Sequence, residues 1–267
     1  MSQHRPIAMR ILPPRLAISL FDRFYRSRRD RWLSLYLDAG LLAAPGVSMR
    51  LVPGDRVSDL IAFTGVRESA LTQRVVKIAR KGGTMIDIGA NLGYFSLLWA
   101  ASHASNQCIA FEAGPRPKEI LLENIKKNGM ADRIQVIPHA AAAKPGKLLF
   151  DLGPEDQCGW GGIAITKGLR QIEVEAVRVD SVVMVDEPIA LLKVDVEGAD
   201  AWALMGCERL LQSKLVEEIW FEQNKPRMEL LGVQTNAAQE YLESVGYRCT
   251  PHNNVNDSMV EWSAVPS

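Results

Sequence analysis

The sequence has no excess of charge of either sign, since 31 lysines and arginines balance 31 aspartates and glutamates. Proteins that attract nucleic acid through their overall electrostatic field carry a marked net positive charge, so no nucleic-acid partner is expected. The balance is uneven along the chain. The first fifty residues hold nine arginines and only three aspartates, Asp22, Asp30 and Asp38. The remainder is therefore slightly acidic.

Cysteines are few and far apart, with no C-x-x-C pair among Cys108, Cys158, Cys207 and Cys249. This spacing provides neither a structural zinc site nor a disulfide framework. Long apolar runs are also missing, because no stretch approaches the ~20 residues of a membrane-spanning helix. The N-terminus lacks the apolar core and cleavage site of a secretory signal peptide. We therefore expect reduced thiols and a cytoplasmic location.

What is present is an ordinary globular composition, with 47% apolar and 23% charged residues. The length of 267 residues suits one α/β domain with an N-terminal appendage. Residues 15–37 mix arginines with apolar residues at helical spacing, which predicts one or two amphipathic helices. Prolines and glycines between 45 and 54 then interrupt the pattern. We expect a helical extension over residues 1–55 and a main domain over residues 56–267.

In the main domain, short apolar strands alternate with amphipathic helices, which is typical of a Rossmann-like α/β fold with a mostly parallel sheet covered on both faces. Strands are predicted at 84–88, 107–111, 134–138, 174–179, 191–194 and 218–221. Helices are predicted at 68–80, 94–102, 118–128, 199–211 and 237–245.

The first strand ends in an acid, Asp87, and continues into a loop with glycines at 89 and 93. Glycine accepts positive φ and lets a backbone approach a ligand, and ligands of such sheets bind beyond the carboxyl ends of the strands. Asn91 stands where a dinucleotide motif has its middle glycine, and Asp87 would repel a pyrophosphate. The loop favours a cationic, phosphate-free cofactor such as S-adenosylmethionine. The predicted contacts are Asp87, Gly89, Ala90, Asn91, Gly93 and Tyr94.

A second acid, Glu112, ends the next strand 25 residues after Asp87. At this spacing α/β cofactor domains bind a ribose diol through a carboxylate. Its two oxygens match two vicinal hydroxyls and would repel a 2′-phosphate. Glu112, with the adjacent Ala113, is therefore predicted to bind the ribose.

Three ionisable residues, Lys193, Asp195 and Glu197, alternate where the strand at 191–194 ends, so strand geometry would place them on one side. An unpaired buried charge is costly, so they either pair with one another or face a cleft. In the first case Lys193 and Asp195 form a structural ion pair. In the second, Asp195 is our first choice and Glu197 the second for a base that takes the proton of an acceptor hydroxyl.

Glu222, which follows the strand at 218–221, is a third candidate base. The three carboxylates could bind Mg²⁺ through oxygen, but no ligand spacing requires it, so a metal is not favoured. None of the four histidines has a motif partner, and we expect structural or surface roles for His4, His103, His139 and His252.

These motifs resemble the FkbM family of methyltransferases, whose first motif D-x-G-A-N-x-G is matched by residues 87–93. Further similar segments are 111–115, 121–129, 178–181 and 193–199, so the resemblance spans roughly residues 60 to 250. It implies a seven-stranded sheet with one reversed strand near the C-terminus, and methylation of oxygen on sugars, polyketides or other secondary metabolites. Trp202 and the segment 156–162 depart from the family pattern. The latter, with Trp160, is either a mobile loop that closes over substrate or a glycine-rich turn.

The expected function is methyl transfer from S-adenosylmethionine to a hydroxyl of a small molecule, sugar or glycan. A non-catalytic cofactor-binding or scaffold protein of this fold would have no use for Asp195 and Glu197. An NAD-dependent oxidoreductase is opposed by the missing middle glycine. A nucleic-acid methyltransferase would be expected to carry a basic face with aromatic stacking residues, and the sequence has none outside the arginine-rich extension. The extension is expected to cap the acceptor site; its arginine-rich helices could instead lie on an anionic membrane.

Overall fold

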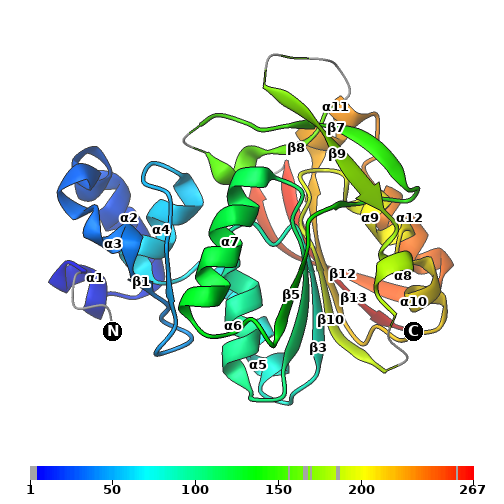
Figure 1. The fold of residues 1–267 in the computed structure, drawn as a ribbon, viewed down its shortest axis with the longest axis horizontal. Helices are drawn as coiled ribbons and strands as arrows, with labels where there is room; N and C mark the ends of the chain where they lie inside the picture. The colour runs from blue at the N-terminus through cyan, green and yellow to red at the C-terminus, as the bar shows by residue number, and fades with distance from the viewer. Residues whose placement is uncertain (1–4, 156, 165–167, 169, 185–186, 257) are drawn as a thin grey trace.

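The computed structural model describes residues 5–155, 157–164, 168, 170–184, 187–256 and 258–267. Its centre is a seven-stranded sheet of order β12-β13-β11-β10-β3-β4-β5 (Figure 1). Five strands run parallel: β3 (Thr84–Ile88), β4 (Gln107–Phe111), β5 (Ile134–Ile137), β10 (Ile189–Val194) and β11 (Ile219–Asn224). Between β11 and β12 (Tyr247–Asn256), β13 (Met259–Pro266) runs antiparallel to both. The predicted mostly parallel sheet with one reversed strand near the C-terminus is confirmed.

Helices cover both faces of this sheet, as predicted (Figure 1). One face carries α5 (Ser69–Ala79), α6 (Tyr94–Ser102) and α7 (Pro115–Lys127). The other carries α8 (Val179–Val182), α9 (Asp200–Met205), α10 (Glu208–Gln212) and α12 (Ala237–Ser244). A further helix, α11 (Lys225–Leu231), follows β11 and was not predicted. Each face therefore has its own apolar cluster, and α5 shows why: its buried residues recur at helical spacing, at Leu71, Thr72, Val75, Ile78 and Ala79.

The helix predicted over 199–211 is divided into α9 and α10. The Asp180 carboxylate accepts the backbone N–H groups of Arg209 at 2.8 Å and Leu210 at 3.3 Å. Free N–H groups in a first turn need such an acceptor, so Asp180 stabilises a new helix start after Gly206. The break therefore depends on a residue distant in sequence from the helix.

A second sheet of four strands lies at the carboxyl end of the main sheet, at the top of Figure 1. Its strands are β6 (Ala140–Ala141), β7 (Gly146–Asp151), β8 (Gly162–Ile163) and β9 (Gln171–Val177). The strand predicted at 174–179 is β9, but its expected place in the main sheet is wrong. In β9, exposed Glu173 and Glu175 alternate with buried Val174 and Ala176, a pattern of a sheet with one solvated face.

The N-terminal region is broken into short turns of helix rather than one or two long helices, at the left of Figure 1. It comprises α1 (Ile7–Ile11), α2 (Pro14–Leu20), the π-helical turn η1 (Phe21–Tyr25), the 3-10 turn η2 (Arg26–Trp32) and α3 (Ser34–Leu37), followed by a hairpin of β1 (Ala39–Gly40) and β2 (Ser48–Met49) and by α4 (Arg56–Thr64). Among the described helices, none is long and apolar enough to cross a membrane.

The extension is firmly attached to α4. Buried Arg5 donates to the carbonyl oxygens of Ile61 at 3.0 Å and Ala62 at 2.8 Å, and the Tyr36 hydroxyl donates to Asp59 at 2.5 Å. Apolar residues of the extension, Tyr36 among them, continue into the cluster under α5, α6 and α7. The extension and this face of the sheet therefore share one core.

Candidate functional site

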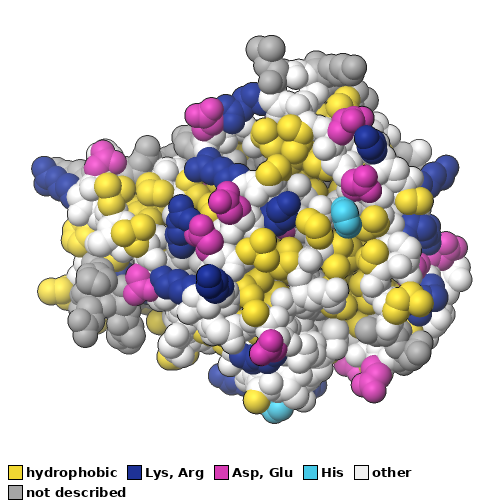
Figure 2. Space-filling model, in the orientation of Figure 1, with side chains coloured by type: hydrophobic (Ala, Val, Ile, Leu, Met, Phe, Trp, Pro, Cys, Tyr) yellow, Lys and Arg dark blue, Asp and Glu magenta, His cyan; other side chains and the backbone are white. Residues whose placement is uncertain are grey.

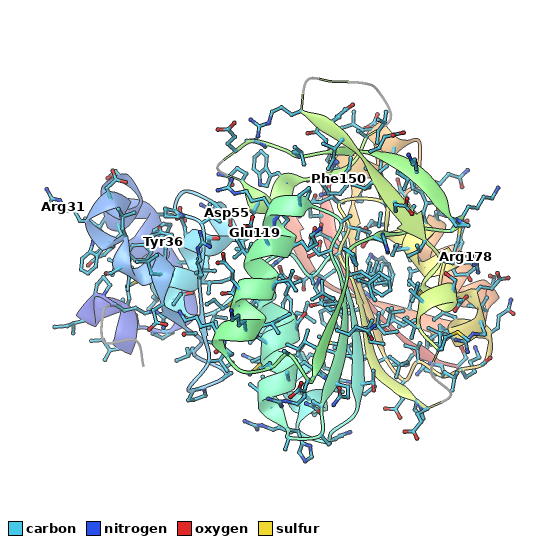
Figure 3. All side chains as sticks on the ribbon, in the orientation of Figure 1. Arg31, Tyr36, Asp55, Glu119, Phe150 and Arg178 are labelled. Atoms are coloured by element: carbon cyan, nitrogen blue, oxygen red, sulfur yellow. The ribbon has the colours of Figure 1, made fainter. Side chains whose placement is uncertain are left out.

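A cavity of about 440 Å³ lies between the carboxyl ends of the main strands and the second sheet. Its volume is in the usual range of small-molecule sites. Figure 3 shows Phe150, one of its lining residues, on β7. Seven of the predicted site residues line it: Gly89, Asn91, Glu112, Ala113, Asp195, Glu197 and Glu222. The structure therefore brings the glycine loop and the acids after β10 and β11 to one cavity.

The other predicted residues lie behind this wall, namely Asp87, Ala90, Gly93, Tyr94 and Lys193. Asp87 is fully buried, accepts from the Ser96 hydroxyl at 2.6 Å and pairs with the Lys193 ammonium at 3.3 Å. The Tyr94 hydroxyl lies 3.2 Å from that of Thr72. The positive charge that Asp87 contacts is therefore the Lys193 side chain of the protein itself. The cofactor contacts and the catalytic roles assigned from the sequence all stay predictions.

Backbone conformation favours glycine at both loop positions, and packing adds to this at Gly89. Gly89 and Gly93 have φ of +77° and +92°. A Cβ at Gly89 would lie 1.9 Å from the backbone oxygen of Asp195, and one at Gly93 would lie 2.5 Å from Leu121. The contact at Gly89 is with backbone and cannot be relieved locally, whereas the Leu121 side chain can rotate away from Gly93; positive φ favours glycine at both positions. Packing within the protein therefore requires glycine at position 89, which also lines the cavity.

Glu112 has the geometry expected of a ribose ligand. Its carboxylate accepts the backbone N–H groups of Asn91 at 2.8 Å and Gly114 at 2.7 Å, while burial raises its pKa to about 7. A carboxylate has about four acceptor positions, so two remain for a diol. On the same wall the Asn91 Oδ1 is buried and has no hydrogen-bond partner among the described residues. These residues fit the nucleoside part of S-adenosylmethionine.

Asp195 and Glu197 follow β10 in a turn and do not continue the strand. β10 ends at Val194, and Glu197 has a left-handed φ of 53°. The expectation that Lys193, Asp195 and Glu197 share one strand side is therefore wrong beyond Val194. Asp195 and Lys193 nevertheless meet, with 3.5 Å between their charged atoms.

The two acids of this turn differ in their electrostatics. Burial opposes ionisation of Asp195, but Lys193 and Arg67, the latter at 3.0 Å, lower its pKa below the usual value. Glu197 accepts one hydrogen bond, from the Asn224 amide at 3.0 Å. Burial, with the nearby charge of Asp195, raises the pKa of Glu197 to about 7. Asp195 is therefore a weak base, and Glu197 can exchange a proton near neutral pH.

Glu222 lies on β11, opposite Glu261 of β13. Burial raises the pKa of Glu222 to about 9, and the carboxylates of Asp195 and Glu197 contribute. Burial also raises the pKa of Glu261 to about 7. At neutral pH Glu222 is therefore protonated and can donate a hydrogen bond into the cavity.

Several lining residues were not predicted, above all Arg67 and His139. Arg67 lies between α4 and α5 in a segment without a motif, and its guanidinium contacts Glu68 and Asp195. His139 was expected to be structural or at the surface, but it lies on the cavity wall after β5. The position beyond a parallel strand could have indicated this.

The remaining histidines lie elsewhere in the fold. His103 contacts the Ser105 hydroxyl, His252 stacks on Trp220 with 4.5 Å between ring centroids, and His4 lies outside the described residues. Trp160 lines the cavity from the 3-10 turn η3 (Cys158–Trp160) and is 62% exposed. Asp156, at the start of the segment 156–162, is also outside the described residues.

Two further expectations concern a metal and the extension. Within the described ranges, no group of three or more His, Cys, Asp or Glu side chains is arranged to hold a metal ion. That catalysis needs no Mg²⁺ stays a prediction. No described residue before Val57 of α4 lines the cavity, so the described part of the extension gives no support to the expected cap, which stays a prediction. The four cysteines are free thiols.

Comparison with known proteins identifies the family. Residues 87–249, more than half of the chain, match the family model described as "Methyltransferase FkbM domain". No curated protein shows significant sequence similarity to the chain.

Solved structures resemble the chain only distantly. A precorrin-6y C5,15-methyltransferase from Geobacter metallireducens is 13% identical over 76% of this chain and 90% of its own, with a TM-score of 0.47. An rRNA methylase from Streptococcus thermophilus is 11% identical over 74% and 94%, with a TM-score of 0.46. The S-adenosylhomocysteine-bound methyltransferase PaMTH1 from Podospora anserina is 13% identical over 76% and 80%, with a TM-score of 0.47. Similarity this distant does not bear on the substrate.

The family match covers the glycine loop, Glu112 and the acids that meet at the cavity. The sheet order, with its reversed strand β13, is that of class I methyltransferases. The chain belongs to the FkbM family of S-adenosylmethionine-dependent methyltransferases.

Proposed function

We propose that this methyltransferase modifies a hydroxyl oxygen of a small molecule, sugar or glycan. The proposal rests mainly on the shared cavity. Gly89, Asn91 and Glu112 line it together with the carboxyl groups of Asp195, Glu197 and Glu222, which could accept a hydroxyl proton or donate a hydrogen bond. An alcohol is a poor nucleophile until its proton leaves, so a carboxylate within reach of the acceptor assists the transfer.

The three acids would have different roles because their pKa values differ. Glu197 would take the hydroxyl proton, because a base whose pKa lies near the working pH is most effective. Glu222, protonated at neutral pH, would donate a hydrogen bond that orients the acceptor. Asp195 would hold Arg67 and Lys193 in place through its ion pairs. When bound, S-adenosylmethionine supplies an electrophilic sulfonium methyl.

A screen with isotopically labelled methyl donor tests the proposal. Hydroxylated metabolites, monosaccharides and glycans should be compared with matched amine and deoxy analogues, and products read by mass spectrometry. We expect label only in hydroxyl compounds, as a methyl ether. Label on nitrogen or carbon, or in RNA alone, would contradict the choice of oxygen.

We expect Glu112→Ala to weaken binding of S-adenosylhomocysteine by about 1–3 kcal/mol, the cost of losing hydrogen bonds to a charged acceptor. Calorimetric titration measures this. Because the ionised carboxylate is the acceptor and its pKa is about 7, affinity of the unmodified protein should fall as the pH drops below that value. Glu119→Ala, at an exposed position of α7 labelled in Figure 3, is the matched control and should bind normally. Stabilisation by NAD in place of S-adenosylmethionine would refute the cofactor assignment.

A further inference from the structure

Exposed large hydrophobic side chains are concentrated in the extension. Of eleven such residues in the described part of the chain, seven lie within residues 7–42: Ile7, Ile11, Leu16, Phe24, Leu33, Leu37 and Leu42. Ile7 and Ile11 are 75% and 76% exposed and lie one helical turn apart. Figure 2 shows hydrophobic side chains on this end of the molecule. Single exposed apolar residues are ordinary, whereas a gathering of them indicates an interaction surface.

The sequence of the same segment, residues 7–42, holds seven arginines and three aspartates. Two of these acids are already paired with cations outside the segment, Asp22 with Arg56 at 3.0 Å and Asp38 with Lys127 at 2.6 Å. Exposed Arg23 lies with its guanidinium 5.6 Å from the ring centroid of Phe24. Arg31 projects from the far end of the extension (Figure 3).

We infer that residues 7–42, here called the extension surface, dock this protein onto an anionic lipid bilayer. Apolar side chains interleaved with arginines suit the boundary between headgroups and acyl chains, where the guanidinium stays among the headgroups and the apolar part enters the chains. Anionic headgroups also attract basic residues directly. The partner is therefore a membrane surface that the protein lies on without crossing.

The rest of the fold is consistent with this role. The buried side of the extension packs on the core through Phe21, Leu35 and Tyr36, and Arg5 is bonded to α4. The extension surface is thus held in place before docking, which lowers the entropic cost of binding. None of its described side chains lines the cavity, so docking would leave the cavity open.

A second copy of the chain is the less favourable occupant. A two-fold interface brings the same patch of both copies together, so two arginine-rich surfaces would face each other. Like charges in apposition oppose association. An anionic bilayer provides the opposite charge and an apolar layer at once.

The test is co-sedimentation of the full chain with vesicles of phosphatidylserine and phosphatidylcholine, against phosphatidylcholine alone. We expect binding to the anionic vesicles that weakens with added salt. The double variant Ile7→Ser/Ile11→Ser should lower the partition coefficient about tenfold or more, since each isoleucine contributes its transfer to an apolar phase. Met184→Ser/Leu230→Ser, at residues 81% and 68% exposed outside the extension, should bind as the unmodified protein does.

A double variant that removes two positive charges tests the electrostatic part of the binding. Arg23→Gln/Arg31→Gln should lower binding to anionic vesicles roughly fivefold for each arginine. Lys81→Gln/Arg248→Gln removes the same charge at exposed positions elsewhere and should have little effect. All variants are checked for unchanged thermal unfolding, and Leu37→Ser replaces the isoleucine pair if that variant fails to fold.

Three results would overturn the inference. The first is equal binding to neutral and anionic vesicles, or none to either. The second is an equal loss in the variants and their matched controls. The third is a dimer in analytical ultracentrifugation that Ile7→Ser/Ile11→Ser converts to a monomer, which would assign the surface to a second copy.

Discussion

Glu197→Gln is expected to lower turnover on the true acceptor about 10²–10⁴-fold while leaving cofactor affinity close to normal, because general-base catalysis contributes on this scale. Glutamine keeps the size and the contact with Asn224 but cannot take a proton. At saturating S-adenosylmethionine, where the ionisation of Glu112 no longer limits the rate, the unmodified enzyme should gain activity as the pH rises through about 7, where Glu197 ionises, and the variant should lose this rise.

Steady-state rates across pH, with calorimetric titration of S-adenosylhomocysteine, measure both effects. Glu217→Gln, at an exposed position before β11, is the matched control. The sequence favoured Asp195 over Glu197; the ion pairs of Asp195 with Lys193 and Arg67 reverse that order. If Glu197→Gln kept full activity while Asp195→Asn were folded but inactive, Asp195 would again be the preferred base. Full activity of both would leave Glu222 as the residue to test.

Lys193→Met is expected to destabilise the fold by about 3–5 kcal/mol, the cost of leaving buried charge without its partner. Lys193 is 1% exposed and its ammonium lies 3.3 Å from Asp87, 3.5 Å from Asp195 and 3.4 Å from the Gly89 carbonyl oxygen. Without it Asp87, which is fully buried, keeps the Ser96 hydroxyl as its one polar side-chain partner among the described residues.

Urea unfolding monitored by circular dichroism measures the loss. Adding Asp87→Leu to Lys193→Met should recover much of the stability, because an apolar pair replaces a buried ion pair at little cost. The exposed Lys81→Met is the control and should unfold as the unmodified protein does. A change below about 1 kcal/mol in Lys193→Met would show that the buried pair is not a stabilising unit.

The parts of the fold that the sequence predicts well are those encoded by local pattern. β3, α6 and β4 have the predicted bounds, because apolar runs, the acid at a strand end and the glycine loop follow one another directly. The approach of Glu112, Asp195 and Glu222 to one cavity also follows from sequence, since parallel strands end at a common edge.

What the sequence does not predict depends on contacts between distant segments. Arg67 reaches Asp195 across 128 positions of sequence, and no local pattern specifies that pair. Glu197 has a left-handed φ, and the next residue, Gly198, lies where a Cβ would meet Arg227 and Met228; no local pattern specifies either. The preference of β9 for the second sheet was visible in its alternation, but that pattern does not say which partner strand it joins.

The close contact between Gly89 and the Asp195 carbonyl has a thermodynamic consequence. The glycine loop and the acid turn pack so closely that a Cβ at Gly89 would not fit beside the Asp195 carbonyl oxygen. A ligand that orders one turn also orders its neighbour, and the second ligand then meets a smaller entropic cost. We therefore expect donor and acceptor binding to be linked, in which case reciprocity requires each to tighten the other by the same factor.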